Sequence, residues 1–143
     1  EWRDDATGET EGPISAGIGL ISLPSGEVHG FVADHAGVLR RVSLPQESAE
    51  VAALDDDAFE RPLHVDFAVS LEGRVWSTPA ILEDMVVVGT DADLLYAIDR
   101  ERGTIRWQRR VGSCDGVHGP GPEGGRRDVD GGPTVTADGD LLV

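Results

Sequence analysis

The sequence contains no lysine and no asparagine, and its single cysteine is Cys114. Without asparagine the chain holds no N-glycosylation sequon. One cysteine cannot form a disulfide within the chain, so the cysteine content does not distinguish an oxidising from a reducing compartment. All 12 basic residues are arginines, which we interpret as the coding bias of a GC-rich bacterial genome.

Basic residues are few: the chain has 12 of them and 27 acidic residues, which gives a formal net charge of −15 at pH 7. Such a field repels phosphate backbones, whereas non-specific nucleic-acid binding comes largely from cations that neutralise phosphates. We therefore expect no binding of DNA or RNA.

Long apolar runs are also missing. The longest is roughly Met85 to Val88, far short of the ~20 residues that span a bilayer, so we expect no membrane-spanning segment. The chain starts at Glu1 without a leader and stops within the apolar run 141–143. We expect both ends to continue in a longer protein, and a signal peptide or lipid anchor could precede Glu1.

Helical periodicity is scarce. The stretch 46–59, rich in alanine and acidic residues, could form a short helix or an exposed loop. Elsewhere short apolar strings alternate with turn signals, a pattern typical of meandering antiparallel strands. The sequence therefore predicts an all-β fold.

The clearest unit runs from Trp76 to Val111. It predicts strands at 78–82, 85–89, 94–98 and 105–111, joined by tight turns rich in Asp and Gly, which favour turns. One such sheet is too small to bury both faces alone.

The strand–turn–strand pattern recurs. Pro133 lies 54 residues after Pro79 and opens a similar stretch, and 31–39 aligns with 87–95 at an offset of 56 residues. Propeller blades repeat every ~40–50 residues, so we expect insertions to account for the excess.

We therefore predict a partial β-propeller of four-stranded antiparallel blades, about two blades and the start of a third. The predicted division is a polar terminus at 1–13, a degenerate first blade at 14–71 with an acidic insertion at 45–62, a well-formed blade at 72–111, a Gly/Pro-rich insertion loop at 112–131, and the truncated start of the next blade at 132–143.

One string is specific to a family. Ala97, Asp99, Gly103 and Trp107 stand at the first, third, seventh and eleventh positions of 97–107. This string resembles the tryptophan-docking motif, A-x-D-x-x-T-G-K-x-x-W, of the pyrroloquinoline-quinone (PQQ)-like β-propeller repeat family. The resemblance implies that Trp107 locks one blade to its neighbour, while the small residues leave room for the indole. The first unit matches weakly, because it has no clear Ala, Gly and Trp triad.

Other polar residues are of types that could carry chemistry. They are the loop from Cys114 to His118 with Glu123, Asp128 and Asp130, the Asp pairs 91/93, 128/130 and 138/140, and His29, His35 and His64. Structural zinc usually takes four ligands, the Asp pairs lack the order of a calcium loop, and no histidine is matched with a nucleophile. We predict no catalytic, cofactor-binding or metal residue.

Three functions stay open. The preferred one is a non-enzymatic binding or scaffolding module with protein partners, resembling the propellers that assist outer-membrane assembly, which implies a periplasmic or outer-membrane-associated place in a bacterial cell envelope. The second is a sector of a quinoprotein dehydrogenase with PQQ and calcium. It is disfavoured because that family's adjacent cysteine pair and asparagine ligand are missing. The third is the sensor ectodomain of a signalling protein.

Overall fold

The structure is a computed structural model that describes residues 12–44, 64–111 and 131–142. These residues form ten strands, and none of them is helical. The strands are β1 (Gly19–Ser22), β2 (Val28–Ala33), β3 (Val38–Leu44), β4 (His64–Ser70), β5 (Ala80–Ile81), β6 (Met85–Gly89), β7 (Leu94–Asp99), β8 (Ile105–Arg110), β9 (Thr134–Val135) and β10 (Leu141–Leu142).

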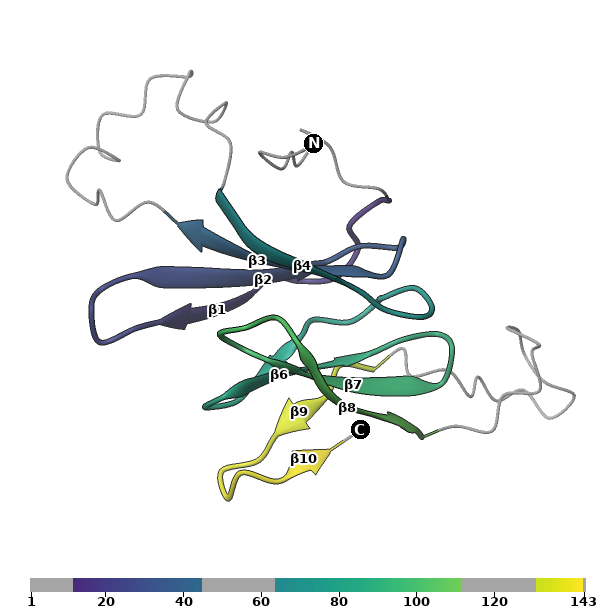
Figure 1. Cartoon of the computed structure of the whole chain (residues 1–143). Helices are drawn as coiled ribbons and strands as arrows, with labels where there is room; N and C mark the ends of the chain where they lie inside the picture. Colours follow the sequence, from purple (N-terminus) through teal and green to yellow (C-terminus); the bar gives the residue numbers. More distant parts are fainter. Residues whose placement is uncertain (1–11, 45–63, 112–130, 143) are drawn as a thin grey trace, which may run out of the picture.

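The strands make two four-stranded sheets and one hairpin. The first sheet has the order β1-β2-β3-β4, the second has the order β5-β6-β7-β8, and β9 pairs with β10. Every pairing is antiparallel between consecutive strands. Figure 1 shows the two sheets as stacked layers, with β9 and β10 beyond the second sheet. The predicted all-β fold of four-stranded antiparallel sheets is confirmed, and it fits a partial propeller.

The internal repeat is visible in the strand registers. Ala33 pairs with Leu39 in the first sheet, and Gly89 pairs with Leu95 in the second. The two turns that follow β2 and β6 also match, because Gly37 and Asp93 both adopt a left-handed backbone conformation, with φ values of 77° and 61°. The offset of 56 residues between the two units therefore reflects a shared geometry.

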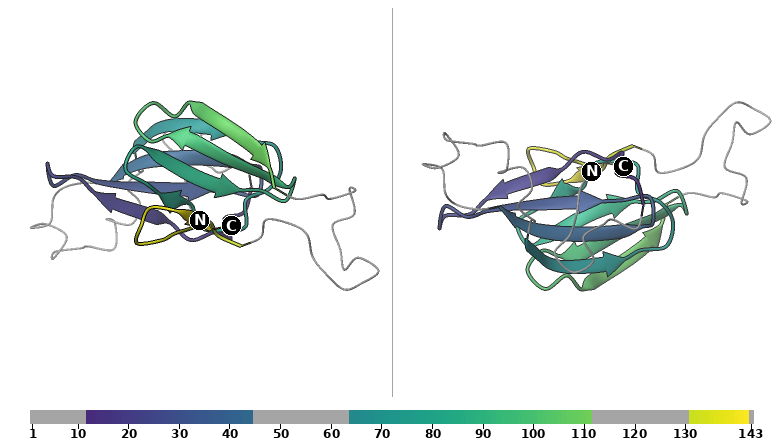
Figure 2. Two further views of the ribbon diagram at one scale, coloured as in Figure 1. Left: turned by 90° about the horizontal axis from the view of Figure 1, so that it is seen from below. Right: turned by 90° about the horizontal axis from the view of Figure 1, so that it is seen from above.

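The main core lies between the two sheets. Its buried members come from both sheets and from the crossover 71–79 that joins them, and include Phe31, Leu39, Val75, Val88 and Ile98. The two views of Figure 2 look onto the stack from opposite sides, and in each view one sheet lies over the other. Each sheet covers a face that the other could not bury alone, which is how repeats of this size become stable.

The first strands of successive units lie next to one another. β1 contacts β5, and β5 contacts β9. The second sheet's opposite face holds a smaller core of Ala80, Val87, Leu95 and Ala97, against which Leu141 of β10 packs. The three units thus follow one another around the side formed by β1, β5 and β9, as blades do in a propeller.

The first strand of the second sheet is shorter than the sequence predicts. The predicted strand spans 78–82, whereas the observed strand is only Ala80–Ile81, because Pro79 precedes it and has no N–H to donate to a neighbouring strand. The stretch 46–59, predicted as a short helix or loop, lies outside the described residues. In the described part of the chain, no helix is long and apolar enough to cross a membrane.

Candidate functional site

The turn between β7 and β8 carries the predicted docking motif. The Asp99 carboxylate accepts hydrogen bonds from the backbone N–H groups of Glu101 and Arg102, at 3.0 Å and 2.8 Å. Gly103 closes the turn with φ at +67° and donates its N–H to the Asp99 carbonyl at 2.9 Å. Asp99 therefore fixes the turn through its own side chain, as aspartate does in Asx-turns.

An arginine of the next strand completes this arrangement. Arg106 donates through Nη2 to Asp99 Oδ2 at 2.8 Å, and its Nη1 contacts Asp84 in the turn before β6. The Arg106 side chain, with help from the two backbone N–H groups, lowers the pKa of Asp99 well below its usual range. Hydrogen bonds to Asp84, which has the larger effect, and to Asp99 raise the pKa of Arg106. The ion pair is thus part of the turn's structure.

Gly103 is also the point where the two sheets meet. A Cβ built on Gly103 would lie 2.6 Å from two ring atoms of Phe67, which belongs to β4 of the first sheet. Only a glycine lets the Phe67 ring lie directly on the backbone here. Phe67 also packs on Phe31 with ring centroids 6.5 Å apart. The aromatic ring of one sheet therefore sits on the motif glycine of the next.

Arg41 of β3 adds a polar link at the same place. It pairs with Asp66 at 2.8 Å within its own sheet. Its Nη1 donates to the Arg100 carbonyl at 3.0 Å and to Glu101 Oε2 at 3.1 Å in the second sheet. Its guanidinium carbon lies 5.2 Å from the centre of the Phe67 ring. The hydrogen bonds to Arg100 and Glu101 thus join the two sheets, while the cation–π contact lies within the first sheet and holds Arg41 beside Phe67.

Phe67 and Trp107 occupy matching positions. Phe67 pairs with Arg41 and Trp107 pairs with Ala97, and in both sheets the register shifts directly after that pair. Ala97 belongs to the core on the side of β10. Trp107 is 40 % exposed within the described residues, so its docking onto a neighbouring blade stays a prediction.

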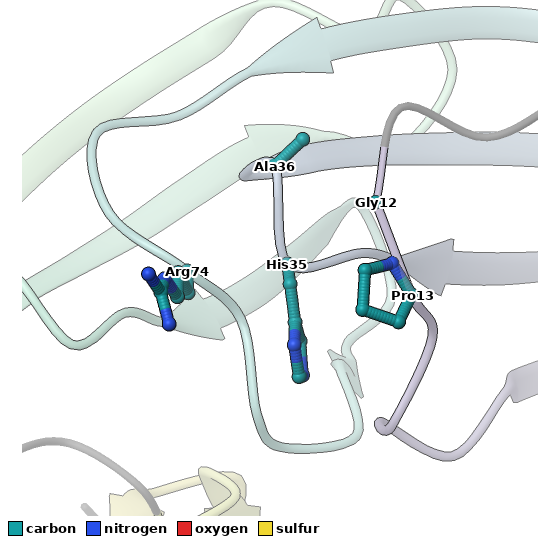
Figure 3. Close-up of a pocket in the computed structure, with 5 residues that line it drawn as sticks. All are labelled: Gly12, Pro13, His35, Ala36 and Arg74. Atoms are coloured by element: carbon teal, nitrogen blue, oxygen red, sulfur yellow. The ribbon is translucent and has the colours of Figure 1, made fainter.

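A separate open pocket of about 330 Å³ lies where the β2–β3 turn meets the crossover to the second sheet. Gly12, Pro13, His35, Ala36 and Arg74 line it. In Figure 3 the His35 ring lies between Arg74 and Pro13. The pocket therefore combines one guanidinium, one imidazole and an apolar ring.

The structure places the three candidate histidines apart. His29 is buried in β2. His35, in the β2–β3 turn, contacts the Trp76 ring at a tilt of 45° with centroids 4.0 Å apart. His64 begins β4 with Nε2 3.6 Å from Asp66. Of the three, His35 lines the pocket described above.

The candidate aspartates that are described hold turns. Asp91 accepts a hydrogen bond from the Arg74 N–H at 2.7 Å, and Asp93 lies 3.7 Å from Arg110. Asp138 and Asp140 belong to the β9–β10 turn. Within the described ranges no three His, Cys, Asp or Glu side chains gather closely enough to hold a metal ion. The loop Cys114–His118, with Glu123, Asp128 and Asp130, lies outside those ranges.

Phe67, Arg41 and the pocket were missed by sequence reasoning. The segment 45–63 separates Phe67 from β3, so the docking motif's spacing is lost in the first unit. The alternation Val65, Phe67, Val69 was the available signal for a strand with an inward aromatic. Nothing in the sequence brings Pro13 next to Arg74.

The chain resembles known proteins in structure and not in sequence. No protein-family model matches the sequence, and no curated protein does. Among solved structures, the chain is similar to BamB from Moraxella catarrhalis, with a TM-score of 0.51 and 18 % sequence identity. The match covers 72 % of this chain and 26 % of BamB, so the chain spans about a quarter of that protein's length. At this identity the likeness shows the fold alone, and that fold is a sector of a β-propeller.

Proposed function

We propose that this chain belongs to a non-enzymatic β-propeller that acts as a binding or scaffolding module in a bacterial cell envelope. The observation that supports this most is the contact between the two blades. Phe67 lies on Gly103, and Arg41 bonds to Arg100 and Glu101. The turn that carries the motif thus contacts the neighbouring repeat through Gly103, Arg100 and Glu101.

The electrostatics support a scaffold over a catalyst. Strongly shifted pKa values usually mark catalytic residues when they occur in clefts. Here the shifted groups, Asp99 and Arg106, bind each other and the backbone of one turn, and neither lines the pocket at His35. Their charges are already used to fix the fold.

The envelope location rests on two likenesses. The docking motif resembles propellers that assist outer-membrane assembly, and the fold is similar to that of BamB. We therefore propose a periplasmic or outer-membrane-associated protein with protein partners.

Fractionation of cells that carry the full-length gene tests this proposal. We expect the protein in the periplasmic or outer-membrane fraction, together with co-purifying protein partners and a weakened envelope when the gene is deleted. Recovery in the cytosolic fraction, with an intact envelope after deletion, would contradict it.

We also propose that the protein works without PQQ or calcium. Calcium takes about 6–8 oxygen ligands, whereas Asp91 bonds to the Arg74 N–H and Asp93 pairs with Arg110. Titration of the full-length protein with PQQ and calcium should leave its tryptophan fluorescence unchanged and produce no dye-linked alcohol oxidation. Micromolar binding with turnover would favour the dehydrogenase instead.

A further inference from the structure

Within the described part of the chain, the Arg74 side chain has no ion-pair partner, although the net charge of the protein is −15. Most of the described arginines form ion pairs with carboxylates: Arg40, Arg41, Arg100, Arg102, Arg106 and Arg110. Among the residues that the structure describes, no carboxylate pairs with the side chain of Arg74 or of Arg109. Arg74 differs from Arg109 because its side chain lines a pocket.

The pocket holds a second polar group without a partner. His35 Nε2 is buried and makes no hydrogen bond to any described residue. Buried polar atoms in folded proteins nearly always have a partner, so an orphan beside a pocket suggests that a ligand or solvent supplies one. Within the described residues, neither His35 Nε2 nor the Arg74 guanidinium has a hydrogen-bond partner.

An exposed aromatic ring stands next to these groups. Trp76 is 41 % exposed, and its ring makes a tilted contact with His35 at 4.0 Å between centroids. Asp91 Oδ2 lies 3.5 Å from Trp76 Nε1. An indole that is held in place but uncovered offers a flat apolar surface to a ligand.

The backbone around the pocket is tightly packed. The Arg74 N–H donates to Asp91, and the Asp91 N–H donates to the Arg74 carbonyl at 3.0 Å. The His35 N–H donates to the Pro13 carbonyl at 3.0 Å. A Cβ on Gly37 would lie 2.3 Å from the Gly73 carbonyl, so the β2–β3 turn and the crossover are locked together. The pocket is preorganised, which lowers the entropic cost of binding.

We propose that this pocket binds a carboxylate carried by an apolar group, supplied by a peptide segment of a partner protein. Arginine binds carboxylates through two parallel hydrogen bonds, and Trp76 and Pro13 would contact the apolar part. A single carboxylate suits the pocket better than a phosphate, because Asp91 is adjacent and the chain's net charge of −15 repels polyanions. The statement that a protein supplies the carboxylate rests on the proposed binding role.

Calorimetric titration of the full-length protein tests this site with three acetylated tripeptides. The first is alanyl-alanyl-leucine with a free carboxyl terminus, the second is its amide, and the third is alanyl-glutamyl-leucine amide. We expect the first or the third to bind and the second not to bind. Binding of the first peptide would identify a chain terminus as the source of the carboxylate, and binding of the third would identify an acidic side chain.

Arg74→Gln should weaken the binding of the carboxylate peptide about tenfold or more, the usual effect of losing a charge-assisted hydrogen bond. Arg109→Gln is the matched control, because it removes the same charge from an exposed arginine on β8 and should change affinity less than about twofold. Unchanged urea midpoints for both variants would show that they fold.

Three outcomes would overturn the proposal: equal losses for the two arginine variants, affinity for the second peptide equal to that for whichever carboxylate peptide binds, or no binding of any peptide at about 1 mM. These outcomes leave the envelope proposal standing, since fractionation and deletion test that separately.

Discussion

At the scale of single residues, Gly103 carries the contact between the blades. Gly103→Ala would force a Cβ to within 2.6 Å of the Phe67 ring and place alanine at a φ of +67°. We expect the free energy of unfolding to fall by about 2–4 kcal/mol, combining strain at positive φ with overpacking. Urea denaturation of the full-length protein measures it.

Gly26→Ala is the control for this prediction. Gly26 also has a positive φ, of 92°, but a Cβ there would meet nothing within 4 Å. It should cost only the conformational part, about 1 kcal/mol. Equal losses for the two variants would show that Phe67 does not rest on Gly103.

Asp99 gives a prediction about pH. Arg106 lowers the pKa of Asp99 in the folded protein, so the charged carboxylate stabilises the fold relative to an unfolded chain with a pKa of about 3.9. This contribution is fully present above about pH 4 and is lost as the pH falls through the lower folded value. Asp99→Asn should therefore destabilise the protein at neutral pH, and its difference from the wild type should shrink below about pH 4.

Urea midpoints measured across the acid range test this. Asp138→Asn, in the exposed β9–β10 turn, has no described ion-pair partner and should show a small difference that does not follow this pH course. A deficit for Asp99→Asn that stays constant down to about pH 2 would contradict the role of the Arg106 pair.

At the scale of elements, β4 should matter through its aromatic residue. Phe67 is half-buried against Phe31 and Gly103, and Phe67→Ala should cost about 2–4 kcal/mol of unfolding free energy, as truncation of packed aromatics does. Leu20→Ala, on β1 with a side chain 59 % exposed, should cost well under 1 kcal/mol. Comparable costs would show that β4 does not join the blades through Phe67.

The second sheet could be predicted from sequence because its signals are local. Met85–Gly89 was predicted with its observed bounds, and the turn at Asp99 to Gly103 contains both of its determinants within five residues. The first sheet could not be read as well, because the segment 45–63 separates β3 from β4. In the first sheet, Arg41 and Phe67 stand where alanine and tryptophan stand in the second. The strand pairing and the register shift are therefore shared, but the sequence of the motif is not.

The pocket was beyond sequence reasoning for a different reason. It joins Pro13, His35 and Arg74, three residues from separate connecting segments. Connecting segments carry no periodicity that would predict their mutual placement. Only the packing of the two sheets brings them together.

At the scale of the whole molecule, the open edges have consequences. β4 and β8 are edge strands of their sheets, and β8 leaves Ile105 and Trp107 partly exposed. Unpaired edges and apolar faces are templates for association with other chains. Purified residues 1–143 should therefore self-associate or fold poorly in analytical ultracentrifugation and melting experiments. A sharply melting monomer would show that this piece is a complete domain.

Docking of Trp107 onto a following blade should stabilise the whole propeller. In the full-length protein, Trp107→Ala should cost about 3–5 kcal/mol of unfolding free energy, as for buried aromatics in general. Trp2→Ala, in the polar terminus, should cost little. Equal shifts of the denaturant midpoint for both would contradict the docking role.

The most direct measurement is the solvent accessibility of Trp107 itself. In full-length protein in which every tryptophan except Trp107, including Trp2 and Trp76, is replaced by phenylalanine, Trp107 fluorescence should be blue-shifted and protected from acrylamide, because a following blade covers its indole as Gly103 covers Phe67. In residues 1–143 the same indole, 40 % exposed, should be quenched more readily. If the indole is quenched as freely in the full-length protein as in residues 1–143, Trp107 does not dock onto a following blade.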